Sequence, residues 1–309
     1  MATSTVEQYC QSGRWEFSDA SDLDIFDVTG EGPVIVDQAL GVLRMTMPRQ
    51  WVADLAHLRP DWYGAASTVA LKNNSMRYGT VTARYRASGI PGAVSTLIMI
   101  APQGVDGRDE IDLEWLGGNR DVVSTNVFAG GHVVYAVNGL EIPVNETSAW
   151  HEYTVEWTPE HIKWSVDRKL LRTRFLTDSW TTVDHANLPV NSVIFPIDPL
   201  QIQIGLWDSG RTGVAGTIAW CETFCFLQKL HDSDYPCRAG GPMPWHSYLE
   251  AVVELDYLDI ACHTENPHPT SPIKSPRIGL APPAHHKSLS PSYHPLGTAR
   301  HSGRLQSWN

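Results

Sequence analysis

Three acidic residues alternate with apolar residues in one short run, Glu110-Ile111-Asp112-Leu113-Glu114-Trp115. Successive side chains of a β-strand point to opposite faces, so Glu110, Asp112 and Glu114 are predicted to share one face. Carboxylates that share a site push each other's pKa values apart, so one can stay protonated near neutral pH while its neighbour is ionised. The pattern therefore predicts acid–base chemistry. The alternative is a solvated acidic strand face.

The same run resembles the active-site strand of glycoside hydrolase family 16, whose pattern is Glu-(aliphatic)-Asp-x-Glu. Three further segments resemble fungal Crh-type cell-wall transglycosylases and, less closely, plant xyloglucan transglycosylases: residues 78–84, 150–160 and 216–220. The resemblance extends from about Phe17 to Cys262. Several motifs in one order are far more specific than the acidic strand alone.

The resemblance implies a retaining β-glycosidase or transglycosylase acting on chitin, β-glucan or both. It implies Glu110 as the nucleophile, Glu114 as the general acid/base and Asp112 as the helper that tunes both. The Cα atoms of Glu110 and Glu114 are ~13 Å apart on a flat strand, at ~3.3 Å per residue. The two catalytic carboxyl groups of retaining glycosidases lie roughly 5–5.5 Å apart. Bending of the strand and convergence of the two side chains must therefore bring the carboxyl groups of Glu110 and Glu114 closer than their Cα atoms. A non-catalytic carbohydrate-binding jelly roll or an inactive pseudoenzyme is the alternative, and the complete trio favours the enzyme.

A second alternating run, residues 201–207, predicts a strand that binds sugar. Its aliphatic residues should face the core, whereas Gln203 and Trp207 share the other face. In a sugar-binding site, an indole ring packs on the apolar face of a pyranose, and amides form hydrogen bonds with its hydroxyls. The alternative interpretation of Trp207 is an ordinary, partly buried Trp without a binding role. The resemblance to a cleft-lining strand favours binding. The other predicted substrate-binding residues are Glu114, Asn126, Thr217 and Trp220.

The elements that position these residues are predicted to be strands. Alternation or β-rich composition marks residues 42–47, 76–87, 93–100, 124–128, 154–157, 162–166 and 249–262. Residues 93–100 are apolar on both faces, which is typical of a central covered strand. No long segment has a helical period. The resemblance specifies an all-β jelly-roll sandwich of the concanavalin A-like lectin/glucanase type, with two curved antiparallel sheets and a cleft on the concave face.

Three regions are predicted along the chain: an N-terminal segment, 1–14; the jelly-roll domain, 15–263; and a disordered Pro/Ser/His-rich tail, 264–309. One stretch departs from the family order. Cys221 to Arg238 separates Trp220 from the Ala-Gly-Gly turn expected directly after it. The stretch is either a retained intron translated in frame or a genuine surface loop.

The composition excludes several classes of protein. The net charge of −11 argues against a nucleic-acid partner, and no apolar run approaches a membrane span. Of the five cysteines, Cys10 and Cys262 flank the resembling region and could pair, whereas the others lie within 221–238. No His has the customary zinc-finger spacing, so we predict no metal and no cofactor.

The resemblance implies a location outside the cell or in the cell wall, although neither a signal peptide nor an anchor signal is visible in this sequence. Two N-glycosylation sequons, Asn73-Asn74-Ser75 and Asn145-Glu146-Thr147, are consistent with secretion. The predicted partners are a polysaccharide substrate and an oligosaccharide acceptor. The protein is predicted to be a monomer.

Overall fold

The computed structural model describes residues 10–30, 32–48, 66–90, 93–102, 109–129, 132–133, 140–177, 195–208 and 249–263. All of them belong to one compact unit, Met1–His263. The predicted tail and the stretch 221–238 lie outside the described residues. Among the described residues, no helix has the length and the apolar composition of a membrane span.

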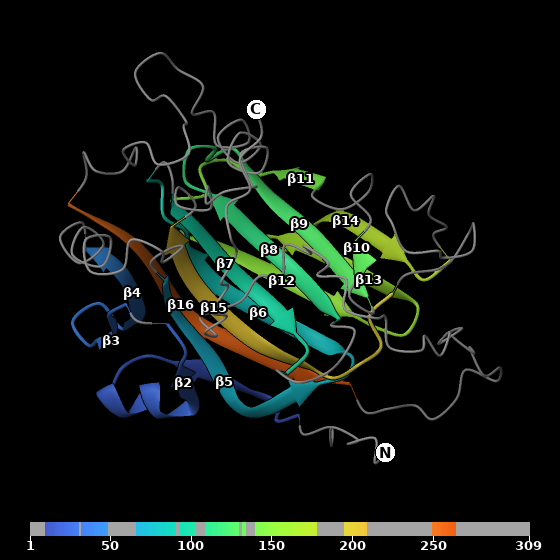
Figure 1. The fold of residues 1–309 in the computed structure, drawn as a ribbon, viewed down its shortest axis with the longest axis horizontal. Helices are drawn as coiled ribbons and strands as arrows, with labels where there is room; N and C mark the ends of the chain where they lie inside the picture. The colour runs from blue at the N-terminus through green and yellow to red at the C-terminus, as the bar shows by residue number, and fades with distance from the viewer. Residues whose placement is uncertain are drawn as a thin grey trace, which may run out of the picture. The chain divides into compact units, whose positions relative to one another are not determined.

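Two antiparallel sheets make up this unit (Figure 1). The first, which we call the front sheet, has the order β10-β9-β8-β7-β15-β5-β2, and β11 pairs with β9. Its strands are β2 (Phe26–Val28), β5 (Ala66–Met76), β7 (Ala93–Ile100), β8 (Glu110–Leu116), β9 (Val122–Ala129), β10 (His132–Val133), β11 (Leu140–Pro143) and β15 (Leu200–Asp208).

The second sheet, which we call the back sheet, has the order β14-β13-β12-β6-β16-β4-β3, and β1 pairs with β16. Its strands are β1 (Gly13–Glu16), β3 (Val34–Asp37), β4 (Val42–Pro48), β6 (Gly79–Arg86), β12 (His151–Trp157), β13 (His161–Val166), β14 (Lys169–Phe175) and β16 (Glu250–Cys262). A short 3-10 helix, η1 (Ala20–Ile25), precedes β2. The last described strand, β16, therefore lies inside the sheet, between β6 and β4.

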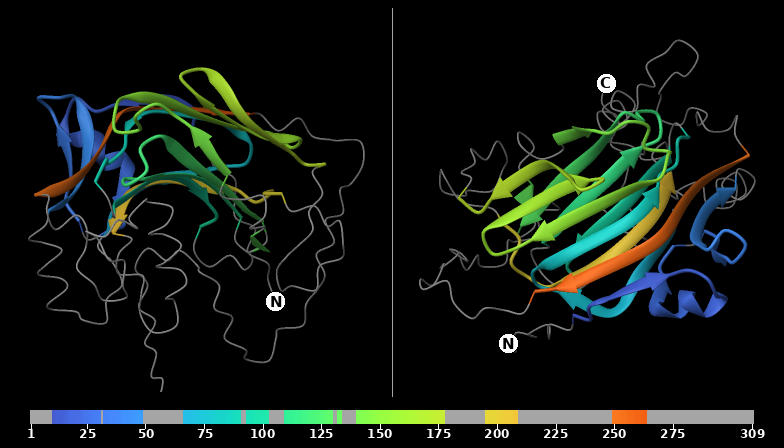
Figure 2. Two further views of the ribbon diagram at one scale, coloured as in Figure 1. Left: turned by 90° about the horizontal axis from the view of Figure 1, so that it is seen from above. Right: turned by 180° about the vertical axis from the view of Figure 1, so that it is seen from behind.

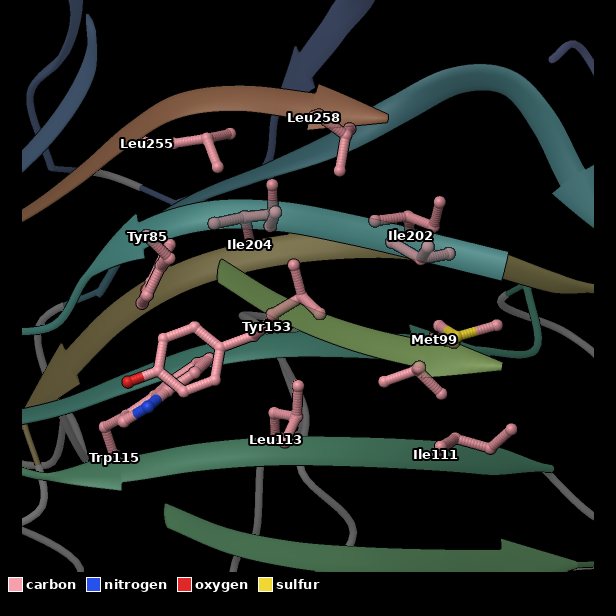
Figure 3. Close-up of a cluster of buried hydrophobic side chains, with 14 of the residues drawn as sticks. Tyr85, Met99, Ile111, Leu113, Trp115, Tyr153, Ile202, Ile204, Leu255 and Leu258 are labelled. Carbon is pink, nitrogen blue, oxygen red and sulfur yellow. The ribbon is translucent and has the colours of Figure 1, made fainter. Parts of the chain in front are cut away.

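The sheets stack face to face around the core. Figure 2 (left) shows both bent in the same direction, with the front sheet on the inside of the bend and its free face concave. Apolar side chains from both sheets meet between them (Figure 3). The ring of Trp115 from β8 packs 4.6 Å from that of Tyr85 and 4.7 Å from that of Tyr153, measured between centroids. These contacts anchor β8 to the back sheet.

The strand predictions hold with one correction. Every residue of β7 is buried and the strand lies between β8 and β15, which confirms the prediction for residues 93–100. The strand predicted over 76–87 is present as β6, Gly79–Arg86, but it begins three residues later than predicted. β5 ends at Met76, and β6 begins at Gly79 after a turn in which Tyr78 has a φ of +66°. The two strands belong to different sheets, so the apolar pattern runs on across a change of sheet.

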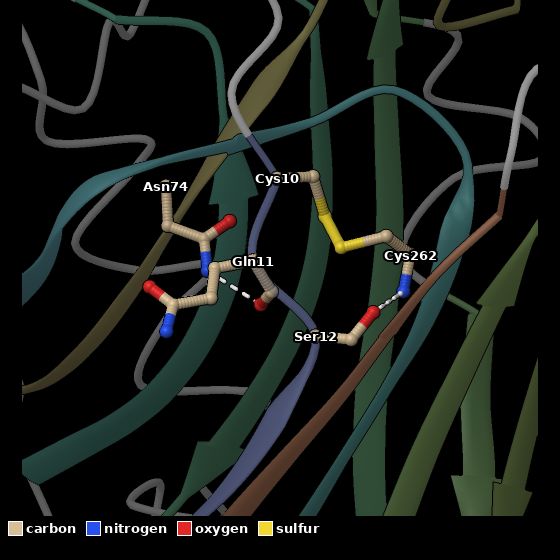
Figure 4. Close-up of a disulfide and its surroundings, with 5 residues drawn as sticks. All are labelled: Cys10, Gln11, Ser12, Asn74 and Cys262. Atoms are coloured by element: carbon tan, nitrogen blue, oxygen red, sulfur yellow. Dashed lines mark hydrogen bonds between the residues drawn. A yellow bond between two sulfur atoms is a disulfide. The ribbon is translucent and has the colours of Figure 1, made fainter.

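A disulfide joins the two ends of the sandwich. Cys10 pairs with Cys262 at the end of β16, across 252 residues (Figure 4). The main-chain N–H of Cys262 also donates to Ser12 Oγ, and Asn74 Nδ2 donates to the main-chain oxygen of Gln11. In the chain-entropy model a cross-link that closes a loop of this length stabilises the fold by roughly 5 kcal/mol. The pairing that the sequence left open is therefore present.

Candidate active site

The three acids of β8 lie in the middle of the front sheet, on its free face. Their apolar neighbours Ile111, Leu113 and Trp115 point into the core (Figure 3), so the alternation of the strand turns the acids outward. β9 and β7 flank each of them. Glu110 pairs with Phe128 and Ile100, Asp112 with Asn126 and Ile98, and Glu114 with Ser124 and Thr96.

Burial separates these acids from an ordinary solvated strand face. Glu110 is 7% exposed, Asp112 is 4% exposed and Glu114 is partly buried. Placing like-charged carboxylates together away from water is costly, and proteins accept that cost at sites that use the charge. The alternative of a solvated acidic face does not fit this burial.

The electrostatics of the site give Glu114 the property of a proton donor. Burial and, secondarily, the negative charge of Glu110 raise the pKa of Glu114 to about 7. Both effects disfavour the ionised carboxylate. Near neutral pH a substantial fraction of Glu114 therefore carries a proton, in the same site as a second carboxyl group, Glu110.

Asp109 is a contributor to the site that the sequence did not indicate. Its side chain is 2% exposed, and Oδ2 accepts hydrogen bonds from the main-chain N–H groups of Ile197, at 2.6 Å, and Asp198, at 2.9 Å. Those residues lead into β15. The carboxylate thus ties the start of the acidic strand to the entry of the strand that carries Gln203 and Trp207. Partners 88 and 89 residues away leave no local signal in the sequence.

A second support comes from the core, behind the strands next to β8. The hydroxyl of Tyr85, on β6, lies 3.3 Å from the main-chain oxygen of Thr96 and 3.4 Å from that of Gly205, and its one proton is within reach of both acceptors. Thr96 is the β7 partner of Glu114, and Gly205 is the β15 partner of Thr96. A back-sheet side chain therefore fixes the backbone of the strands beside the acids.

The predicted sugar-binding residues of β15 lie on the same free face. Gln203, Gly205 and Trp207 follow at successive outward positions, and Trp207 pairs with Val94 and Ala66. A Cβ added to Gly205 would lie 2.5 Å from Thr68 Cγ2 and 3.0 Å from Thr96 Oγ1. No side chain fits there without a shift.

Of the predicted binding residues on other strands, Asn126, Thr217 and Trp220, the structure describes Asn126. Asn126 lies beside Asp112 on β9, and its Oδ1 accepts a hydrogen bond from the main-chain N–H of Val127 at 3.0 Å. Thr217 and Trp220 lie outside the described residues. Within the described part of the chain, no cluster of three His, Cys, Asp or Glu side chains is arranged to hold a metal ion.

Known proteins are similar to this chain in sequence. Crh-like protein 3 of Botryotinia fuckeliana is 31% identical over 214 residues, which are 66% of this chain and 41% of that protein. Probable glycosidase CRR1 of Saccharomyces cerevisiae is 26% identical over 200 residues, 64% of this chain and 42% of that protein. This chain thus spans about two fifths of the length of these relatives.

Solved structures confirm the jelly-roll sandwich. The Crh5 transglycosylase in complex with NAG has a TM-score of 0.60 at 24% identity, covering 83% of this chain and 86% of that chain. A prokaryotic β-1,3-1,4-glucanase (lichenase) from a mouse hindgut metagenome has a TM-score of 0.54 at 16% identity, covering 82% and 100%. The sequence model of glycosyl hydrolases family 16 matches residues 24–222, which include all three acids. The resemblance read from the sequence is confirmed, and the chain belongs to glycosyl hydrolases family 16.

Proposed function

We propose that this protein is a retaining β-glycoside hydrolase or transglycosylase that acts on cell-wall polysaccharide, either chitin or β-glucan or both. The observation that carries the proposal is the raised pKa of Glu114 beside Glu110, on one buried and concave strand face. A proton donor and a nucleophile in one site are what a double-displacement mechanism requires.

In the first step, Glu114 donates its proton to the glycosidic oxygen while the carboxylate of Glu110 attacks the anomeric carbon. The bond between that carbon and the leaving oxygen breaks, and the leaving sugar departs with the proton. A covalent ester joins the remaining sugar to Glu110. The pKa of about 7 keeps Glu114 available as an acid near neutral pH.

In the second step, Glu114 acts as the base. It takes a proton from the incoming nucleophile, which is a sugar hydroxyl in transglycosylation or water in hydrolysis. The nucleophile attacks the anomeric carbon, the ester bond breaks, and Glu110 returns as a carboxylate with Glu114 protonated. Asp112 lies between the two residues on the strand, and its charge tunes the proton affinity of both.

The binding surface is assigned to side chains around this trio. Trp207 supplies an apolar platform for a pyranose ring, and Gln203 and Asn126 supply amides for its hydroxyls. Thr217 and Trp220 belong to the same proposed set. The Crh5 transglycosylase, a structure with this fold, was solved in complex with NAG, which supports an N-acetylglucosamine polymer as one substrate. We place the protein in the cell wall, as a monomer without a nucleic-acid partner.

In the deciding experiment, the full chain is incubated with labelled oligosaccharides of chitin and of β-glucan. The products are then resolved by mass. Transfer gives products longer than either starting sugar, whereas hydrolysis gives shorter ones only. Glu110→Gln, similar in shape but without the nucleophile, is the matched control and should give neither. Unchanged oligosaccharides together with measurable binding would contradict the proposal and indicate a non-catalytic carbohydrate-binding jelly roll.

A further inference from the structure

We infer that Asn145 and Asn73 are N-glycan acceptor sites, and that Asn145 is modified before the domain closes. Each asparagine begins an Asn-x-Ser/Thr sequon. Each is exposed in the folded chain, so a glycan has room there. The inference concerns a modification of the protein and is independent of the activity proposed above.

Asn145 lies in a turn that does not depend on its side chain. The turn connects β11 to β12, and main-chain bonds hold it: the N–H of Thr147 donates to Arg120 O at 2.8 Å, and the N–H of Ala149 donates to Glu146 O at 2.8 Å. The ring of His151 contacts the main-chain oxygen of Asn145, with Nε2 at 3.0 Å. The amide of Asn145 is thus free to carry a substituent without loss of these contacts.

The third residue of this sequon sets the order of events. Thr147 is 1% exposed, and its Oγ1 has no hydrogen-bond partner among the described residues. A transferase that reads the sequon must reach the hydroxyl at this position. Folding hides it, because Thr147 lies between the residue that follows β6, Ala87, and the β8–β9 connection at Arg120. Modification of Asn145 must therefore precede folding.

The sheet topology keeps the Asn145 sequon unfolded long enough for Asn145 to be modified. The back sheet lacks an inner strand until β16 arrives between β6 and β4. β16 starts at Glu250, which is 103 residues after Thr147 (250 − 147). Chains grow at about 5–20 residues per second, so the sequon stays unfolded for roughly 5–20 s after its synthesis. The Asn73 sequon, in β5, is made earlier and waits longer.

Asn73 lies at an irregularity of the strand. It has a φ of +46°, and the register between β5 and β15 shifts in this part of the strand. Its neighbour Asn74 is the one fixed by the fold, since the side chain of Asn74 is buried and donates to Gln11 O beside the Cys10–Cys262 disulfide (Figure 4). Asn73 itself stays exposed.

The Cys10–Cys262 disulfide indicates folding in a compartment where N-glycosylation also takes place. Disulfides of this kind form in oxidising compartments such as the endoplasmic reticulum lumen. A lipid-pyrophosphate-linked oligosaccharide is the donor class. The asparagine Nδ2 bonds to the anomeric carbon of the sugar, the bond from that carbon to the pyrophosphate oxygen breaks, and the amide gives up one proton. The products are the glycosylated chain and the lipid pyrophosphate.

To test the two sites, the full chain is fused to a secretion leader and secreted from yeast. Its intact mass is then measured before and after enzymatic removal of N-glycans. We expect two glycans on the wild-type chain and one on each of Asn145→Gln and Asn73→Gln. Thr147→Val is the matched control: it keeps the buried shape and Asn145 but destroys the sequon, and it should also lose one glycan. A mass unchanged by substitution of either asparagine overturns the assignment of that asparagine.

The order of events has its own readout. Unglycosylated protein made in bacteria, folded and disulfide-bonded, is incubated with solubilised oligosaccharyltransferase and its lipid-linked donor. A second sample is first reduced and unfolded. We expect peptide mapping to find a glycan on Asn145 only in the unfolded sample. Equal modification of both samples would overturn the requirement that Asn145 be modified before folding.

Discussion

The carboxylate of Asp109 holds the main chain of Ile197: Oδ2 accepts the N–H of that residue at 2.6 Å, and the next N–H, of Asp198, at 2.9 Å. Asp109 directly precedes Glu110, and the segment it holds runs into β15. One buried side chain therefore links the start of the acidic strand to the segment that enters the strand carrying Trp207. Small displacements of reacting groups cost large factors in rate, so this link should matter for turnover.

Asp109→Ala is expected to lower kcat by about ten- to a hundredfold and to reduce the free energy of unfolding by about 3 kcal/mol, since two partly buried N–H groups lose a charged acceptor. Asp109→Asn keeps an acceptor oxygen and should recover most of the stability and of kcat. Steady-state kinetics and urea unfolding check both variants. Full wild-type kcat in a folded Asp109→Ala protein would remove Asp109 from the site.

The roles of Glu110 and Glu114 predict different rescue behaviour. Glu110→Gln and Glu114→Gln should each remove nearly all turnover with an intact fold. Azide should restore activity to Glu110→Gly by replacing the missing nucleophile, and the product should be a glycosyl azide of inverted configuration. Glu114→Ala should keep activity on substrates with good leaving groups that need no acid, once azide attacks the glycosyl-enzyme. Wild-type rates in either Gln variant would refute the assignment.

The raised pKa of Glu114 predicts the pH dependence of catalysis. Because the first step needs protonated Glu114, kcat/KM should fall as the pH rises through about 7. Glu110→Gln removes the charge that contributes to the shift, so the pKa of Glu114 should decrease in that variant. NMR titration of 13C-labelled glutamate carboxyls measures it directly. An unchanged pKa would show that burial alone causes the shift.

The same shift predicts the pH dependence of stability. The folded-state pKa of Glu114 lies above its unfolded value of 4.5, so the folded protein binds more protons between these values. The contribution of Glu114 to stability is therefore fully present below pH 4.5 and is lost as the pH rises through about 7. Glu114→Gln cannot ionise, so it should be more stable than the wild type at pH 8 by urea unfolding. The difference should shrink as the pH is lowered.

The sequence predicted the shared face of the three acids because its signal is local. Alternation along β8 places the acids on one face without knowledge of the partner strands, and the apolar run of β7 marks the centre of the sheet. The turn at Tyr78 was missed because the apolar pattern continues across it. Asp109 and Tyr85 were missed for another reason. Their partners come from distant strands, and only the fold brings those together.

Trp207 provides a test of the proposed binding surface. It lies on the free face of β15, two strands from Glu114 in the sheet order. If its indole supports a sugar ring, Trp207→Ala should weaken oligosaccharide binding by about tenfold or more while the melting temperature changes little. Isothermal titration and thermal unfolding separate the two effects. A large loss of stability with unchanged affinity would make Trp207 a packing residue.

The stretch 221–238 provides the last prediction. It begins directly after Trp220 of the proposed binding set, and the family match ends at residue 222. The stretch carries the apolar residues Phe224, Phe226, Leu227 and Leu230, together with the three cysteines Cys221, Cys225 and Cys237. Apolar surface and reactive thiols promote aggregation and wrong disulfides.

Deletion of residues 221–238 is therefore expected to give a more soluble protein with equal or higher glycosyl-transfer activity. The entropy cost of closing a loop changes little with the length of the loop, so the shorter connection should not unfold the sandwich. A matched variant that keeps the length but replaces the three cysteines by Ser separates the effect of the thiols from that of the apolar residues. Size-exclusion chromatography and the oligosaccharide assay measure both outcomes. A deletion that unfolds the protein or abolishes transfer would show instead that the stretch is a functional loop of this protein, and would refute a retained intron.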